Sequence, residues 1–296
     1  MIALIKRNLL VYTRDRIAFV LSFLSIIILL VLYQIFIGKG QMEAIQQSVP
    51  NQELRDQAVQ MVNFWLIAGL TTVATLTSTL GAFGVMIIDR ENKIDEDFMI
   101  SSYSPWKFEL SYALSAILLG TCISLICCFL GILIFNGTHA FALFTIFDFL
   151  KIFFTITLSC ILSASMTLPL LLFIKSGSAF STLSTIIGTF IGFISGIYIP
   201  IGTVGTPLSQ IMTWFPLTQV NAMLKQELMT SSIKEVFGTA SSSEKITYSE
   251  SYGITLKTLG GHVLSFDNML LYVIVFTFVV IILHFALKKR LLNGKA

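Results

Sequence analysis

Long stretches without any charged side chain are the feature that most limits what this chain can fold into. The stretch 176–224 contains no Asp, Glu, Lys or Arg. Over all 296 residues only 12% are charged and the mean hydropathy is +0.85, whereas soluble globular domains carry about 25% charged residues. A soluble enzyme, a disordered chain and a secreted disulfide scaffold are therefore excluded, and an all-α, polytopic membrane protein is expected.

Six stretches are long and apolar enough to cross a bilayer, because a spanning helix needs about 20 apolar residues. They are residues 17–37, 64–88, 110–135, 152–174, 180–199 and 269–287. The first of them has no small-residue cleavage site and is too long for a signal peptide, so it is expected to remain in the mature chain. The sequence thus predicts one domain, 1–296, with six transmembrane helices.

The distribution of Lys and Arg predicts the orientation of these helices. The N-terminus, the loop after the second span, the short link at Lys175 and the C-terminal tail together carry more cations than the opposite side. Cationic loops stay in the cytoplasm, so both termini are expected there.

The outside then holds a polar or amphipathic helix in 38–63 and a large segment, 201–267. In that segment, glycines and prolines predict short pieces, and the Ser-rich stretch 239–243 predicts a mobile loop.

The first 16 residues have the pattern of an amphipathic helix on the inner surface of the membrane. Their apolar side chains recur at helical spacing, and cations occupy the other faces. The apolar positions are Ile2, Ile5, Leu9 and Tyr12, and the cations are Lys6, Arg7 and Arg14. The alternative is a simple extension of the first span.

The sequence lacks the motifs of an enzyme or an ATPase. It contains no Gly-x-x-x-x-Gly-Lys-Ser/Thr loop to hold ATP phosphates and no His-Glu-x-x-His metal motif. No predicted span has a central carboxylate or lysine, which argues against proton or ion coupling. The formal charge of +3 is too small to suggest a nucleic-acid partner. We therefore expect no catalytic residues, cofactor or metal in this chain, and an energy source in another protein.

The segment 89–107 is the most informative polar stretch. It combines charges with apolar residues at helical spacing, which suits a short amphipathic helix that docks on a soluble partner. The residues expected to couple the chain to that partner are Asp89, Arg90, Glu91, Asp95, Phe98 and Met99. The alternative is a solvated cytoplasmic loop.

Two further patterns suggest helix packing and a polar pathway. Gly188, Gly192 and Gly196 recur every four residues, and small residues at this spacing let a second helix approach closely, either from the same chain or from a second copy. The second span is rich in hydroxyls, which could line a pathway or simply bond their own helix backbone. The pathway candidates are Thr71, Thr75, Ser78 and Thr79.

Three places in the sequence resemble the membrane subunit of an ABC-2 type exporter. The first is Arg14-Asp15-Arg16 before the first span. The second is Asp89-Arg90-Glu91 with Ser102-Tyr103-Ser104-Pro105-Trp106-Lys107, which looks like that family's acidic turn and coupling helix. The third is Gly196-Ile197-Tyr198-Ile199-Pro200-Ile201 with Trp214-Phe215-Pro216-Leu217-Thr218, which is similar to its re-entrant outer hairpin after span five. Asn92-Lys93 replaces the usual Gly-Thr, and span one lacks the frequent proline.

This resemblance covers essentially the whole chain and implies a dimer of six-helix subunits, formed with a second permease copy or a paralogue. Two copies of a separate ABC ATPase, which binds ATP and Mg, would work beneath it. The expected location is a bacterial plasma membrane, in contact with membrane lipid. The expected cargo is an amphiphilic drug, peptide or toxin, with a polysaccharide or lipid-linked glycan as the alternative. Rival readings of the sequence are a stand-alone secondary transporter and an intramembrane enzyme.

Overall fold

The computed structural model describes residues 1–16, 52–94, 104–238 and 242–293, and the rest lie outside the description. The described residues are predominantly helical and form no β-strand, only one isolated bridge between Lys257 and Val263. In chain order the elements are α1 (Ile2–Arg14), α4 (Gln52–Ala82), α5 (Gly84–Glu91), α7 (Pro105–Asn136), η2 (Thr138–Leu143), α8 (Ile146–Leu171), α9 (Gly177–Ile194), η3 (Ile201–Thr203), α10 (Thr206–Trp214), α11 (Pro216–Phe237), α12 (Ser242–Ser251) and α13 (Phe266–Asn293). An all-α fold was the prediction, and the described residues confirm it.

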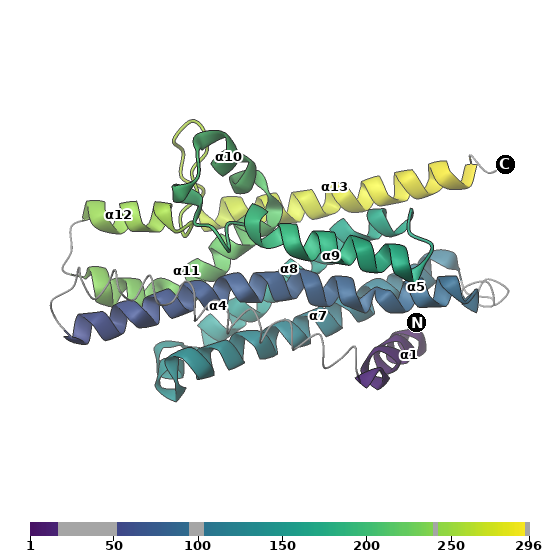
Figure 1. Cartoon of the computed structure of the whole chain (residues 1–296), viewed down its shortest axis with the longest axis horizontal. Coiled ribbons are helices and arrows are strands. Elements are labelled where there is room, and N and C mark those ends of the chain that lie inside the picture. Colours follow the sequence, from purple (N-terminus) through teal and green to yellow (C-terminus); the bar gives the residue numbers. More distant parts are fainter. Residues whose placement is uncertain (17–51, 95–103, 239–241, 294–296) are drawn as a thin grey trace.

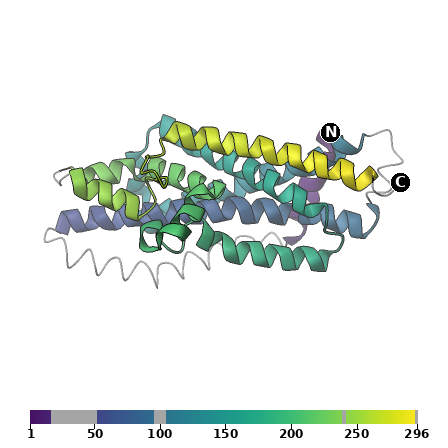
Figure 2. The same cartoon turned by 90° about the horizontal axis from the view of Figure 1, so that it is seen from above.

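The long helices lie side by side in an elongated bundle (Figures 1 and 2). Five stretches are long and apolar enough to cross a membrane: Leu54–Glu91, Trp106–Asn136, Ile146–Leu171, Gly177–Ile194 and Phe266–Leu291. They correspond to five of the six predicted spans. The remaining predicted span, 17–37, lies outside the described residues, as does most of the predicted outer helix in 38–63.

The bundle has two distinct ends. We call one the α1 end, where α1, α5 and the C-terminal part of α13 lie, and the other the α12 end, where α12 and the start of α4 lie (Figure 1). The predicted amphipathic N-terminal helix is present as α1.

Helix α4 forms the centre of the bundle. It packs against α7, α8, α9 and α11, and its large side chains Phe64, Trp65 and Ile67 are fully buried. Only Phe83 separates α4 from α5, so one nearly continuous helical segment runs from the α12 end to the α1 end (Figure 1). By contrast, α9 and α13 bury only a small share of their apolar surface within the chain.

Local sequence signals explain where several helices begin. Thr145 caps α8 through a capping box with Asp148, and the Ser176 side chain accepts a hydrogen bond from the Ala179 amide at the start of α9. Pro105 and Pro216 occupy the first position of α7 and α11, where proline loses no helical hydrogen bond.

The predicted end of the fifth span is wrong by several residues. The stretch 180–199 was expected to be helical throughout, but α9 ends at Ile194. Gly196 has a φ of +66°, which glycine adopts readily and which reverses the chain after a helix. The Gly196 amide donates to the Phe193 carbonyl and the Ile197 amide donates to the Gly192 carbonyl, as expected for such a C-terminal turn. Likewise, the fourth span was predicted to end at residue 174, but the corresponding helix, α8, ends at Leu171.

The segment 201–267 contains short pieces followed by one long helix. Its glycines and prolines predict short pieces, and η3 and α10 are such pieces. After them comes the 22-residue helix α11, whose first turn Pro216 starts rather than interrupts. This helix is largely buried against α4, α8 and α13. Of the predicted mobile loop 239–243, residues 242 and 243 belong to α12, and 239–241 lie outside the described residues.

The two ends of the bundle should face opposite sides of the membrane. Asn92 lies just beyond α5 at the α1 end, and Ile246 is an exposed residue of α12. We expect a membrane-impermeant maleimide to label Ile246→Cys in intact cells, and to label Asn92→Cys only after the cells are opened. Labelling of both positions from the same side would contradict the topology.

Candidate functional site

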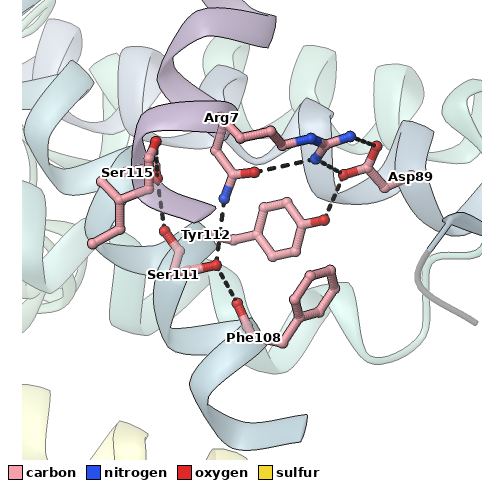
Figure 3. A network of polar contacts seen from close by, with 8 residues as sticks. Arg7, Asp89, Phe108, Ser111, Tyr112 and Ser115 are labelled. Atoms are coloured by element: carbon pink, nitrogen blue, oxygen red, sulfur yellow. Dashed lines mark hydrogen bonds and ion pairs between the residues drawn. The ribbon is translucent and has the colours of Figure 1, made fainter. Parts of the chain in front are cut away.

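The carboxylate of Asp89, at the end of α5, joins three helices. Asp89 is buried, and Arg7 of α1 forms a two-pronged ion pair with it, with 2.7 Å between Arg7 Nη2 and Asp89 Oδ1. The hydroxyl of Tyr112 in α7 donates a hydrogen bond to the same carboxylate (Figure 3). The hydrogen bond to Asp89 raises the pKa of Arg7. Two-pronged pairs of this kind fix geometry as well as charge.

Polar contacts beside Asp89 attach α1 to α7. The Asn8 amide donates to the Ser111 hydroxyl at 3.4 Å, Ser111 donates to the Phe108 carbonyl at 2.6 Å, and the Ser115 hydroxyl lies 3.4 Å from the Ile5 carbonyl (Figure 3). Asn8 and Tyr12 are the buried residues of α1. The buried face of α1 therefore differs from the predicted apolar face. It includes the polar residue Asn8, whereas Ile2, which was predicted to be part of it, is exposed.

The next two residues connect α5 to the link between α8 and α9. Arg90 Nη1 donates to the carbonyls of Leu171 and Ile174, each at 2.7 Å, and so binds the carboxyl end of α8 and the link that follows it. The Glu91 carboxylate accepts a hydrogen bond from the Gly177 amide at 3.0 Å, in the first turn of α9. We call the set Arg7, Asp89, Arg90, Glu91 and Tyr112 the Asp89 junction.

The structure places the six predicted coupling residues in two groups. Asp89, Arg90 and Glu91 lie together in the Asp89 junction, where each contacts another helix of the chain. Asp95, Phe98 and Met99 lie outside the described residues. The neighbours of this undescribed stretch on either side, Lys93 and Trp106, are exposed.

The three glycines predicted to form one packing face have different surroundings. In the described part of the chain, no atom lies within 4 Å of the position that a Cβ would take at Gly188, so this position is open there. At Gly192 a Cβ would collide with the ring of Tyr198. Gly196 lies beyond the end of α9. Of the three, Gly188 is the position at which an added side chain would meet no other described part of the chain.

The hydroxyls predicted to line a pathway are buried inside the bundle. Thr71, Thr75, Ser78 and Thr79 are all buried. Thr75 Oγ1 lies 2.6 Å from Ser159 Oγ of α8, and a Cβ added at Gly120 of α7 would collide with Thr79 Oγ1. In this conformation these residues serve contacts between α4, α7 and α8, and a pathway role for them stays a prediction.

Sequence reasoning missed two polar clusters because their members are distant in the chain. Glu109 of α7 pairs with Lys288 and lies 2.8 Å from His284 Nε2, both on α13. Lys225 of α11 is completely buried beside Trp65 and the Tyr252 carbonyl. Neither contact leaves a signal in sequence spacing. For Lys225, the clue available was its place at the end of the long uncharged stretch.

Replacing Asp89 should loosen α1 by breaking a buried ion pair. We expect Asp89→Asn to lower the free energy of unfolding in detergent by about 2 kcal/mol, since hydrogen bonds to charged groups contribute about that much. Adding Arg7→Met to Asp89→Asn should cost less than the sum of the single changes, because the pair is then removed together. Thermal unfolding measures both effects, with Lys6→Gln on the exposed face of α1 as the control. Strictly additive costs would show that the pair contributes nothing.

Comparisons with known proteins agree with this arrangement. A search among curated proteins found no match. A family model, ABC-2 type transporter, matches residues 1–229. The match covers most of the chain and includes α1, the Asp89 junction and the first part of α11, up to residue 229. The chain therefore belongs to the ABC-2 type transporter family, as a membrane-embedded permease component.

Proposed function

We propose that this chain is the membrane subunit of an ATP-driven exporter in a bacterial plasma membrane, with the α1 end in the cytoplasm. A separate ABC ATPase supplies the energy, and ATP and Mg bind to that protein. The proposed cargo is an amphiphilic drug, peptide or toxin that leaves the cell. A polysaccharide or lipid-linked glycan is the other cargo compatible with the family.

The observation that carries the proposal is the convergence of helices at the Asp89 junction. Asp89 contacts α1 and α7, Arg90 contacts the end of α8, and Glu91 contacts the start of α9. In the sequence, the stretch 95–103 connects the end of α5 to the start of α7, two helices that meet at this junction. A partner that binds this stretch would therefore act on α1, α7, α8 and α9 together, as a transport motor requires.

The same geometry separates residues that position helices from residues that can meet a partner. Asp89 is buried, so its charge is used within the chain. Asn92, Lys93, Trp106 and Lys107 are exposed and flank the predicted docking residues. We assign docking to this exposed group together with Asp95, Phe98 and Met99, and assign the positioning of the docking segment to Asp89 and Arg90.

Truncating a docking residue should uncouple the ATPase without unfolding the permease. An apolar anchor buried at an interface commonly contributes about 2 kcal/mol or more, so Phe98→Ala should lower ATPase co-purification at least about tenfold and abolish transport. Membrane yield and thermal stability should match the parent, in contrast to Asp89→Asn. Ile246→Ala at the α12 end is the control.

If Phe98→Ala and Asp95→Lys both retained the ATPase and full transport, the 89–107 segment would not be the docking site. Transport that persists when the ATPase is deleted would refute the ATP-driven function itself.

We further propose that a second permease copy packs against α9. The support is the low burial of α9 within the chain and the open position of Gly188. Lipid gives helices no hydrophobic reason to associate, so close contact between copies depends on small residues of this kind.

A side chain at Gly188 should therefore weaken the dimer. We expect Gly188→Leu to shift the permease toward monomers in cross-linking and size measurements, and to lower transport in proportion. Gly205→Leu is a matched control, because Gly205 is equally open but lies outside α9. Gly192→Leu is unsuitable, since its side chain would first disturb Tyr198 of the same chain. A normal dimer from Gly188→Leu would show that this face contacts lipid.

A further inference from the structure

One backbone carbonyl at the α12 end receives two buried side-chain donors. The Tyr252 carbonyl, just after α12, accepts a hydrogen bond from Trp65 Nε1 of α4 at 2.8 Å and another from Lys225 Nζ of α11 at 2.9 Å. The Lys225 ammonium also lies 4.8 Å from the centre of the Trp65 ring, within the range of a cation–π contact. We call Trp65, Lys225 and Tyr252 the Tyr252 junction.

This junction attaches the end of α12 to α4 and α11 through polar contacts. Gln226 Nε2 donates to the Ile254 carbonyl at 2.8 Å and adds a third bond from α11 to the same stretch. Ile254 is buried here, whereas Ile246 and its neighbours in α12 are exposed. Residues 252–254 are therefore held by polar bonds to α4 and α11, while the first half of α12 around Ile246 is exposed.

The cation in this junction is held without a carboxylate. In the described part of the chain, Lys225 contacts a carbonyl and an aromatic ring but forms no ion pair. Burial lowers the pKa of Lys225 to about 7. Removing a cation from water is costly, and a carbonyl and a ring offset that cost only in part. The closed arrangement therefore keeps Lys225 buried at a desolvation cost that its two partners offset only in part.

The Tyr252 junction and the Asp89 junction are connected by one helical segment. Trp65 and Asp89 both belong to the stretch Leu54–Glu91. The two residues are 24 positions apart, which corresponds to roughly 36 Å of α-helix, enough to cross a bilayer's hydrocarbon core. Figure 1 shows α5 and α12 at opposite ends of the bundle. A displacement of α5 at one end would therefore move Trp65 at the other.

We propose that the Tyr252 junction is a latch that keeps residues 252–254 docked on α4 and α11 at rest and releases them during transport. This proposal rests on the proposed exporter function. Trp65 and Lys225 lie within the residues that match the family, whereas Tyr252 lies beyond them. The latch therefore joins the family's common helices to a part of this chain outside that match.

The accessibility of residue 254 reports whether the latch is closed. In an Ile254→Cys background, a membrane-impermeant maleimide should react slowly, because this side chain is buried. Adding Lys225→Met removes the charged donor at similar volume and should raise the labelling rate about tenfold or more. Trp65→Phe keeps an aromatic side chain but removes the indole N–H, and is the milder second variant. Both should be compared with the chain that carries only its native cysteines.

Two controls separate latch opening from general unfolding. Lys234→Met changes an exposed lysine on the same helix and should leave labelling at residue 254 unchanged. Ile246→Cys, already exposed, should label at the same rate in every background. If Lys225→Met and Trp65→Phe both left residue 254 protected, the latch would be refuted.

The second arm tests opening during transport. In intact cells that contain the transporter with its ATPase, labelling at residue 254 should rise when the cells are energised and fall when ATP is depleted. Transport measured in the same cells distinguishes the two proposals. ATP-dependent transport with unchanged protection of residue 254 would refute the latch, whereas transport independent of the ATPase would refute the exporter function.

Discussion

A charge removed from water must be paired within the protein, and in this chain that requirement organises the α1 end. The buried carboxylate of Asp89 takes its partners from α1, which is far from α5 in the sequence, and from α7, the next described helix. Leaving a charged group buried without a partner costs several kcal/mol. The positions of α1, α5 and α7 are therefore linked, and none of them can move far without carrying the others.

The apolar helices alone would not define one arrangement, because a Leu side chain gains little by leaving lipid for another helix. Specific contacts must come from polar groups and from close approach at small residues. The segment formed by α4 and α5 makes polar contacts at the Tyr252 junction and at the Asp89 junction. Between these two junctions, the hydroxyl of Thr75 is buried against that of Ser159. The central helix is thus fixed at several points along its length, while α9 and α13 keep most of their surface on the outside.

The sequence was sufficient to predict the parts of the fold that depend on local patterns. Uncharged stretches located five described helices, and the family motifs located Asp89, Arg90 and Glu91 at one site. What it could not show was the partner of each polar group. The contacts between Arg7 and Asp89 and between Lys225 and Tyr252 join positions that are separated by many residues. Such pairs follow no helical or strand periodicity, so the sequence pattern does not reveal them. The end of α9 was also missed, because Gly196 fits the four-residue glycine pattern as well as it fits a helix terminus.

The order of the two charges after Asp89 has a consequence for chain direction. Arg90 faces the carboxyl end of α8, where the helix dipole is negative, and Glu91 faces the amino end of α9, where it is positive. Exchanging the two residues would preserve net charge and composition, yet it would place each charge against a dipole of its own sign. The pair Arg90-Glu91 thus matches the end of α8 and the start of α9. It favours the native chain direction of these two helices over the opposite direction.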